Sequence, residues 1–169
     1  MRDALWLYSN SAGLGHNTGD AHPENTRRLM TLRAMFESDY PELTHIDRVD
    51  ALLPLDWLKT VHAPELIDTL STTKTAQIDG DTILSPGSWL AALEAASIAA
   101  QASRDVINGR TNAAFCALRP PGHHAEYARA MGFCLLNNAV IAALKALENE
   151  ECDKVAIIDW DAHHGNGTE

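Results

Sequence analysis

The sequence predicts an α/β fold built on a mainly parallel sheet. Short apolar runs at residues 113–118 and 155–158 are bounded by polar or turn residues and indicate buried strands. Helical patterns separate the strand candidates, and this alternation is typical of a parallel sheet. The chain has 169 residues, of which 46% are hydrophobic and 21% charged, so one domain with a sizeable core is expected.

The N-terminal part is expected to begin with a strand at residues 4–8, followed by a long loop. Residues 9–24 are rich in Gly, Asn and His without periodicity, and loops of this length in a compact domain are usually functional. Apolar side chains three and four apart predict a helix over 25–37. Two short helices are predicted at 55–62 and 64–71, the second beginning with a proline in its first turn.

The following part alternates polar and helical segments. Residues 72–85 are polar and lack a helical period, whereas 89–108 form a long Ala-rich helix that ends before Gly109. A turn at 132–136 leads into a helix over 137–148. The apolar stripe of that region is expected to be plain core and consists of Leu136, Val140, Leu144 and Leu147.

Composition excludes some classes of function. The net charge of −10 argues against nucleic-acid binding, which relies on Lys and Arg at phosphates, but suits cationic substrates. No apolar run approaches a membrane span, and the first apolar run is too short for a signal peptide. Three widely spaced cysteines do not form a disulfide framework. A cytoplasmic location is therefore expected.

The stretch after residues 155–158 carries metal-ligand chemistry. Asp159, Asp161 and His163 are spaced by two, so an extended backbone would place all three side chains on one face. Carboxylates and imidazoles suit Zn²⁺, and sites in open α/β sheets form beyond the carboxyl ends of strands. A calcium loop is disfavoured because its sixth position, here His164, must be Gly. A polar strand end with satisfied carboxylates is the other alternative.

A histidine pair follows the other apolar run. His123 and His124 come after a Pro-Pro-Gly sequence, in which the prolines fix the loop and the glycine permits close backbone approach. A single buried His is usually a hydrogen-bonded core residue. Two imidazoles beside a metal-ligand cluster are instead what metal-assisted hydrolysis requires.

Three segments in this order, 119–125, 132–139 and 159–166, resemble the zinc-dependent histone deacetylase family. The likeness is greatest to its class II branch, to bacterial deacetylase-like amidohydrolases and to acetylpolyamine amidohydrolases. Asn166 resembles class II, because class I members carry Asp there. The resemblance implies an arginase/deacetylase-like three-layer fold, of which this chain would hold the N-terminal half.

The resemblance also implies residue roles. Asp161 and His163 would be zinc ligands, and His124 the general base and later acid. His123 would stabilise the transition state or protonate the amine. Asp159 would orient one histidine through a hydrogen bond, and Asn166 the other. K⁺ would bind backbone carbonyls of the same loop.

Three further residues are candidates for substrate binding. The Gly132-Phe133 pair matches the family segment whose Phe lines the substrate tunnel. Asp81 lies in the segment that reaches the tunnel mouth, where it would bind the substrate backbone, although a capping or solvated role is an equal alternative. Three further histidines, His16, His22 and His62, are expected to be structural.

The implied activity is removal of acetyl or related acyl groups from lysine side chains or polyamines. Acetylated lysine peptides or proteins and acetylpolyamines are the expected substrates, without a nucleic-acid or membrane partner. A non-catalytic acyl-lysine reader or scaffold is one alternative. An arginase-like metallohydrolase is another, but such sites use two metals and more carboxylates, and the histidine pair favours a deacetylase.

Family catalytic domains supply a third zinc ligand, an Asp, and a transition-state Tyr from later loops, and neither is found here. Residues 1–169 are therefore expected to be the N-terminal part of a single deacetylase catalytic domain, inactive on its own and a weak zinc binder. The predicted sheet would lack its later strands and so have an open edge. A second copy of the chain, as in a homo-oligomer, or a complementary C-terminal part would have to cover that edge.

Overall fold

The computed structural model describes residues 5–169 and has a parallel sheet at its centre. Its strands are β1 (Trp6–Ser9), β2 (Thr44–Ile46) and β5 (Ala114–Ala117), in the order β2-β1-β5. β1 pairs with both neighbours in parallel. The predicted α/β fold with a parallel sheet is thus confirmed. Of the strand predicted at the N-terminus, Ala4 lies outside the described residues.

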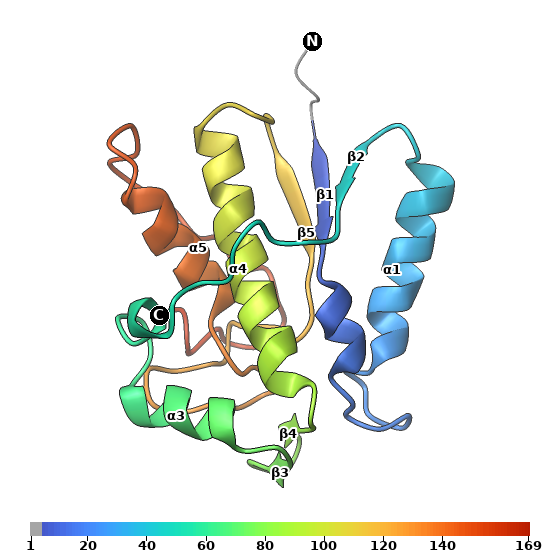
Figure 1. Ribbon diagram of the computed structural model, residues 1–169, viewed down its shortest axis with the longest axis vertical. Coiled ribbons are helices and arrows are strands. Elements are labelled where there is room, and N and C mark those ends of the chain that lie inside the picture. Colours follow the sequence, from blue (N-terminus) through green and yellow to red (C-terminus); the bar gives the residue numbers. More distant parts are fainter. Residues whose placement is uncertain (1–4) are drawn as a thin grey trace.

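Helices cover both faces of this sheet (Figure 1). α1 (Thr26–Asp39) lies on one face and α4 (Ser88–Ile107) on the other, with α5 (Asn138–Leu147) packed against α4. Successive side chains of a strand point to opposite faces. Accordingly, Leu7 packs in the cluster beneath α1 and Tyr8 in the cluster beneath α4. The three-layer arrangement matches the prediction.

Asparagine residues cap the N-termini of two of the helices. The Asn25 side chain accepts a hydrogen bond from the backbone N–H of Arg27, and Asn137 accepts one from Val140. Each bond satisfies a donor that a helix leaves free in its first turn, which is worth about 1 kcal/mol. α1 and α5 therefore begin one residue later than predicted, with the predicted first residue acting as the cap.

The remaining elements are short. They are η1 (Ser11–Gly15), α2 (Leu55–Leu58), α3 (Pro64–Thr72), β3 (Ala76–Gln77) and β4 (Ile83–Leu84). Three predictions were wrong in part. The long N-terminal loop contains the 3₁₀ helix η1, α2 ends well before residue 62, and the polar segment before α4 contains the antiparallel β3–β4 pair. β2 was not predicted.

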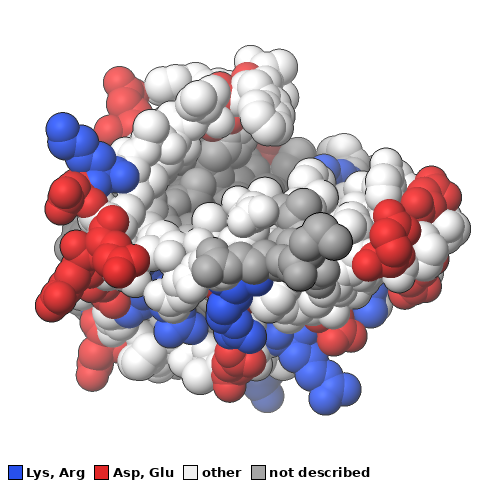
Figure 2. All heavy atoms as spheres, turned by 90° about the horizontal axis from the view of Figure 1, so that it is seen from above, with Lys and Arg blue, Asp and Glu red and all other residues white. Residues whose placement is uncertain are grey.

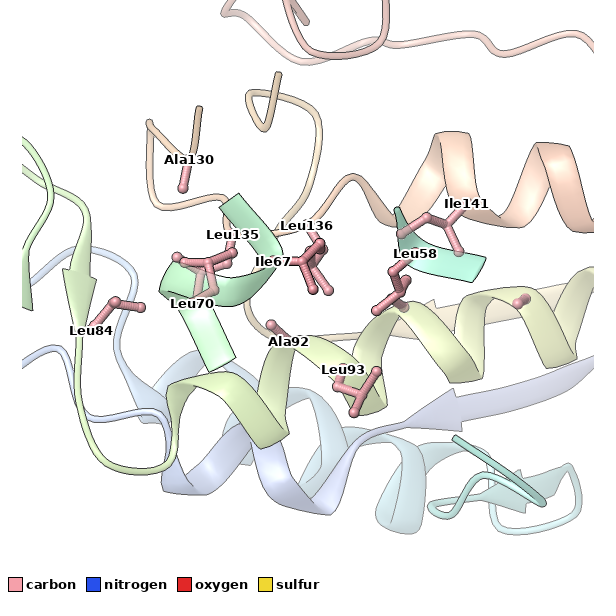
Figure 3. Close-up of a cluster of buried hydrophobic side chains, with 12 residues drawn as sticks. Leu58, Ile67, Leu70, Leu84, Ala92, Leu93, Ala130, Leu135, Leu136 and Ile141 are labelled. Atoms are coloured by element: carbon pink, nitrogen blue, oxygen red, sulfur yellow. The ribbon is translucent and has the colours of Figure 1, made fainter. Parts of the chain in front are cut away.

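The largest apolar cluster lies where α2, α3 and α4 meet the segment leading into α5 (Figure 3). Fully burying one such aliphatic side chain contributes about 1.5–3 kcal/mol. The cluster therefore fixes the end of the loop that follows β5 against α4. Its larger members are Leu58, Ile67, Leu70, Leu84, Leu93, Leu135, Leu136 and Ile141.

The prediction of a buried strand at residues 155–158 was wrong. The segment pairs with no other strand among residues 5–169, and Ile158 is 82% exposed and the nearby Trp160 93%. A strand needs a neighbour within hydrogen-bond reach. Here Val155 and β5 both line a cavity of about 730 Å³, together with α4 and α5.

The stripe predicted on α5 was also wrong in part. Leu136 is buried, but Leu144 and Leu147 are 37% and 43% exposed. The helix instead buries Ile141 and Ala146. Apolar spacing identified the helix but not the face that packs against α4.

The surface carries charges of both signs. On the face shown in Figure 2, Asp and Glu side chains occur together with Lys and Arg side chains. Within residues 5–169, no helix combines the length and the apolar character needed to cross a bilayer.

A buried arginine ties together the loops that leave β1 and β5. The guanidinium of Arg119 donates to Oε1 of Glu24 at 2.8 Å and to the carbonyl oxygens of Gly13 and His16. The Asn10 side chain bonds both the N–H and the C=O of Arg119, at 2.9 and 2.6 Å. The side chains of Arg119 and Glu24 are 1% and 2% exposed. Both loops are therefore held at the carboxyl edge of the sheet.

Replacing Arg119 by Met should lower the free energy of unfolding by about 3–5 kcal/mol, because the buried Glu24 carboxylate would keep only the solvent-exposed Arg28, at 3.4 Å, as a cationic partner. The measurement is denaturant unfolding of the purified protein. Arg27→Met is the matched control, because Arg27 is 71% exposed and only 4.0 Å from an exposed Asp20, and it should cost about 0.5 kcal/mol or less. Equal losses in the two variants would contradict the anchoring role of Arg119.

Candidate active site

Two loops meet at the carboxyl edge of the sheet, one after β5 and one after residue 158. The backbone N–H of Gly167 donates to the carbonyl of His123 at 2.8 Å. A Cβ at Gly167 would lie 2.3 Å from the carbonyl oxygen of Ala125, so only glycine permits this approach. The contact brings the histidine pair and the Asp-rich loop together.

Each histidine of the pair faces one side chain of the second loop. Nδ1 of His123 lies 2.8 Å from Oδ2 of Asp159, and Nδ1 of His124 lies 2.7 Å from Oδ1 of Asn166. The two rings are 4.1 Å apart between centroids. The hydrogen bond with His123 holds the pKa of the Asp159 carboxyl below its ordinary value, so this partner stays ionised near neutral pH.

The two predicted zinc ligands face each other. Oδ2 of Asp161 accepts from the backbone N–H of His163 at 2.8 Å and lies 3.0 Å from Nδ1 of the same residue. The backbone bond, followed by the side-chain bond, lowers the pKa of Asp161. The chain bends at residues 162–163. The predicted single face of three side chains is therefore wrong, because Asp159 points to the histidine pair instead.

The donor chemistry of this pair suits zinc. Ligand atoms about 2.0–2.2 Å from a tetrahedral ion lie about 3.3–3.6 Å from each other, so Oδ2 of Asp161 and Nδ1 of His163, 3.0 Å apart, would need to separate by only about 0.3–0.6 Å. Within the described part of the chain, no group of three or more His, Cys, Asp or Glu side chains is arranged to hold a metal. Asp161 and His163 thus fit two positions of a zinc site and leave the other positions to further ligands.

A cavity of about 350 Å³ opens beside these groups. Seven of the nine site residues predicted from sequence line it, and the exceptions, Asp159 and Asn166, lie behind the histidines. The seven are His123, His124, Asp161, His163, Gly132, Phe133 and Asp81.

The Gly132-Phe133 turn seats His124. Gly132 has a φ of +55°, and a Cβ there would lie 2.4 Å from Cδ2 of His124. Phe133 has a φ of +68°, which is uncommon outside glycine, and its N–H donates to Oγ1 of Thr82 at 3.1 Å. Its ring meets His22 edge to face at 4.8 Å. Phe133 is therefore held at the cavity wall from both sides.

Two histidines outside the cavity are loop anchors, as predicted. Nε2 of His22 lies 2.9 Å from the carbonyl oxygen of Asp81, which fixes that exposed acid at the cavity mouth. The buried His62 contacts the carbonyl oxygen of Glu126 at 3.0 Å and accepts from the N–H of Asn137 at 3.0 Å. Burial lowers the pKa of His62, so it is neutral near pH 7.

Sequence reasoning missed two acids. Glu24 is the buried partner of Arg119, and Glu126 accepts a hydrogen bond from Asn166. Glu24 directly precedes the predicted helix 25–37, and Glu126 directly follows the segment 119–125, but neither position distinguishes a buried acid from a solvated one. Only the partners assembled by the fold reveal them.

The fold agrees with comparisons to known proteins. Residues 22–169 match the model of the histone deacetylase domain, so the chain belongs to the histone deacetylase family. It is 35% identical over 154 residues to histone deacetylase 8 of Arabidopsis thaliana, covering 88% of this chain and 41% of that protein. It is 37% identical over 160 residues to a probable deacetylase of Archaeoglobus fulgidus, covering 92% and 44%.

A solved structure shows the same architecture. The crystal structure of the HDA15 HD domain superposes with a TM-score of 0.91 at 34% identity, covering 99% of this chain and 49% of that one. The match confirms the predicted deacetylase-like fold. The chain spans about half or less of the length of these relatives.

Gly132→Ala should displace His124, because the new methyl group would overlap its ring at a backbone angle that disfavours side chains. The side-chain NMR signal of His124 should shift and its contact with Asn166 should be lost. Gly80→Ala is the control, because a Cβ there meets nothing within 4 Å, and it should leave that signal unchanged. An unshifted His124 signal in Gly132→Ala would contradict the seating role.

Proposed function

We propose that the protein is a zinc-dependent amidohydrolase that removes acetyl or related acyl groups from lysine side chains or polyamines. One observation carries the proposal: two histidines, each held through Nδ1 by a second loop, share a cavity with an adjacent carboxylate and imidazole. Membership of the histone deacetylase family supports the same reaction class.

The two histidines have different surroundings and would perform different tasks. Nδ1 of His124 faces an amide oxygen, so its proton is held there and Nε2 is left with a lone pair for a general base. His123 faces the ionised carboxylate of Asp159. That negative charge would stabilise a positive His123 ring in the transition state, suiting it to assist the leaving amine.

Asp161 and His163 would hold the metal, with further ligands completing the site. When bound, Zn²⁺ polarises the amide carbonyl and makes a bound water more acidic. The chain's own contribution is to place the ring of His124 at the same cavity. The ring of His124 lies 5.9 Å from that of His163, centroid to centroid.

The cavity wall suits an acylated aliphatic amine. Phe133 would pack against the methylene groups of the substrate, and Asp81 at the mouth would accept a hydrogen bond from outside. An acetylated lysine peptide offers backbone N–H groups to this acid, whereas an acetylpolyamine offers ammonium groups. Hydrolysis of an acetylated lysine peptide and of an acetylpolyamine would distinguish these two substrate classes.

In the full-length protein, His124→Ala should lower kcat by about 10²–10⁴-fold while bound zinc is retained, because it removes the general base but no ligand. Hydrolysis of an acetyl-lysine peptide and of an acetylpolyamine is measured together with zinc content. Turnover close to that of the unmodified protein would exclude His124 as the base.

In the full-length protein, Asp161→Ala or His163→Ala should abolish both bound zinc and hydrolysis, since a catalytic zinc site has only three protein ligands. His164→Ala is the matched control, because His164 is 70% exposed and contacts Glu169 instead, and it should keep both. Full zinc occupancy in the Asp161 or His163 variant would contradict these ligand roles.

A further inference from the structure

The half-buried Glu126 stands behind the histidine pair and has no role in the reaction described so far. Its Oε1 accepts a hydrogen bond of 2.7 Å from Nδ2 of Asn166, whose Oδ1 lies 2.7 Å from Nδ1 of His124. We propose that Glu126 is a positioning residue that fixes the tautomer of His124 through Asn166. The catalytic consequence rests on the proposed function.

The donors and acceptors of the three side chains decide the direction of each hydrogen bond between Glu126, Asn166 and His124. An ionised carboxylate can only accept hydrogen bonds, so the NH₂ end of the Asn166 amide must face Glu126. The amide oxygen must then face His124, and Nδ1 of His124 must be the donor. A neutral imidazole protonated at Nδ1 carries its lone pair on Nε2. If the Asn166 amide were turned the other way, its oxygen would face the carboxylate oxygen of Glu126, and neither atom could donate a hydrogen bond.

Glu126 can act in this way because its own backbone is fixed. Its N–H donates to the carbonyl of Arg129 at 2.9 Å, and its carbonyl accepts from Nδ1 of His62 at 3.0 Å. The other ring nitrogen of His62 accepts from the N–H of Asn137, at the beginning of α5. The hydrogen-bond relay, which consists of Glu126, Asn166 and His124, therefore starts from a residue whose backbone is held by hydrogen bonds on both sides.

The relay gives the two histidines unequal electrostatic surroundings. Asp159 contacts His123 directly, whereas the carboxylate behind His124 is separated from it by a neutral amide. A carboxylate in direct contact favours the charged imidazole, and an amide fixes the ring with less charge coupling. Glu126 thus orients the proposed base and remains out of contact with it.

The sharpest test exchanges the two ends of the Glu126–Asn166 contact. Asn166→Asp alone would set two carboxylates where a 2.7 Å hydrogen bond now lies, so kcat should fall about 10–100-fold, the usual effect of losing such an outer partner. Adding Glu126→Gln restores a donor facing an acceptor. The double variant should therefore recover most of the loss.

Single variants at Glu126 complete the test. Glu126→Ala removes the acceptor and should lower kcat about tenfold with KM little changed, whereas Glu126→Gln keeps an acceptor oxygen and should retain most activity. Glu65→Ala, at an exposed acid of α3, is the control. If Glu126→Ala fails to fold, the role of Glu126 is tested by the size-conserving Glu126→Gln variant and by comparing the double variant with Asn166→Asp.

A second readout does not depend on activity. Nitrogen NMR of the zinc-free protein should show His124 protonated at Nδ1 and bare at Nε2, and Glu126→Ala should lose this preference. A double variant no more active than Asn166→Asp, or a tautomer unchanged in Glu126→Ala, would overturn the relay. Absence of deacetylase activity in the unmodified full-length protein would contradict the proposed function, while the NMR result would still decide whether Glu126 fixes the tautomer of His124.

Discussion

The buried ion pair between Arg119 and Glu24 sets the geometry on which the site depends. Because β1 and β5 are parallel, the loops that follow them leave the sheet at the same edge. Arg119 is the second residue after β5, and its guanidinium is enclosed by the loop that follows β1. A buried charge is costly unless every donor finds a partner. The loop carrying the histidine pair therefore has one favourable position.

Close backbone approach then completes the site from that fixed loop. Gly167 lets the second loop reach the carbonyl of His123, and Gly132 leaves room for the ring of His124. Neither glycine contributes chemistry of its own. Each lacks the side chain that would keep two segments apart at that point. The histidine pair therefore shares one cavity with Asp161 and His163, although the residues come from separate loops.

Sequence patterns were most informative where function restricts residue type and spacing. The paired histidines and the Asp-rich loop stand out from sequence alone, and the structure brings them to one place, although their roles stay predictions. Burial depends on neighbours, so residues 155–158 suggested a core strand and are instead exposed. β2, with three residues, is too short to show a period. Glu126 was missed because only the folded chain joins it to Asn166.

The charges around the cavity agree with the proposed chemistry. Hydrogen bonds lower the pKa values of Asp159 and Asp161, so both acids are ionised near neutral pH. Two negative charges beside imidazoles attract a divalent cation, and Asp81 adds a further acid at the mouth. The net charge of −10 would also favour the approach of the cationic substrates that we propose. The proposed substrates, lysine-rich peptides and polyamines, share that positive charge, so selection between them would depend on contacts at the cavity mouth rather than on long-range attraction.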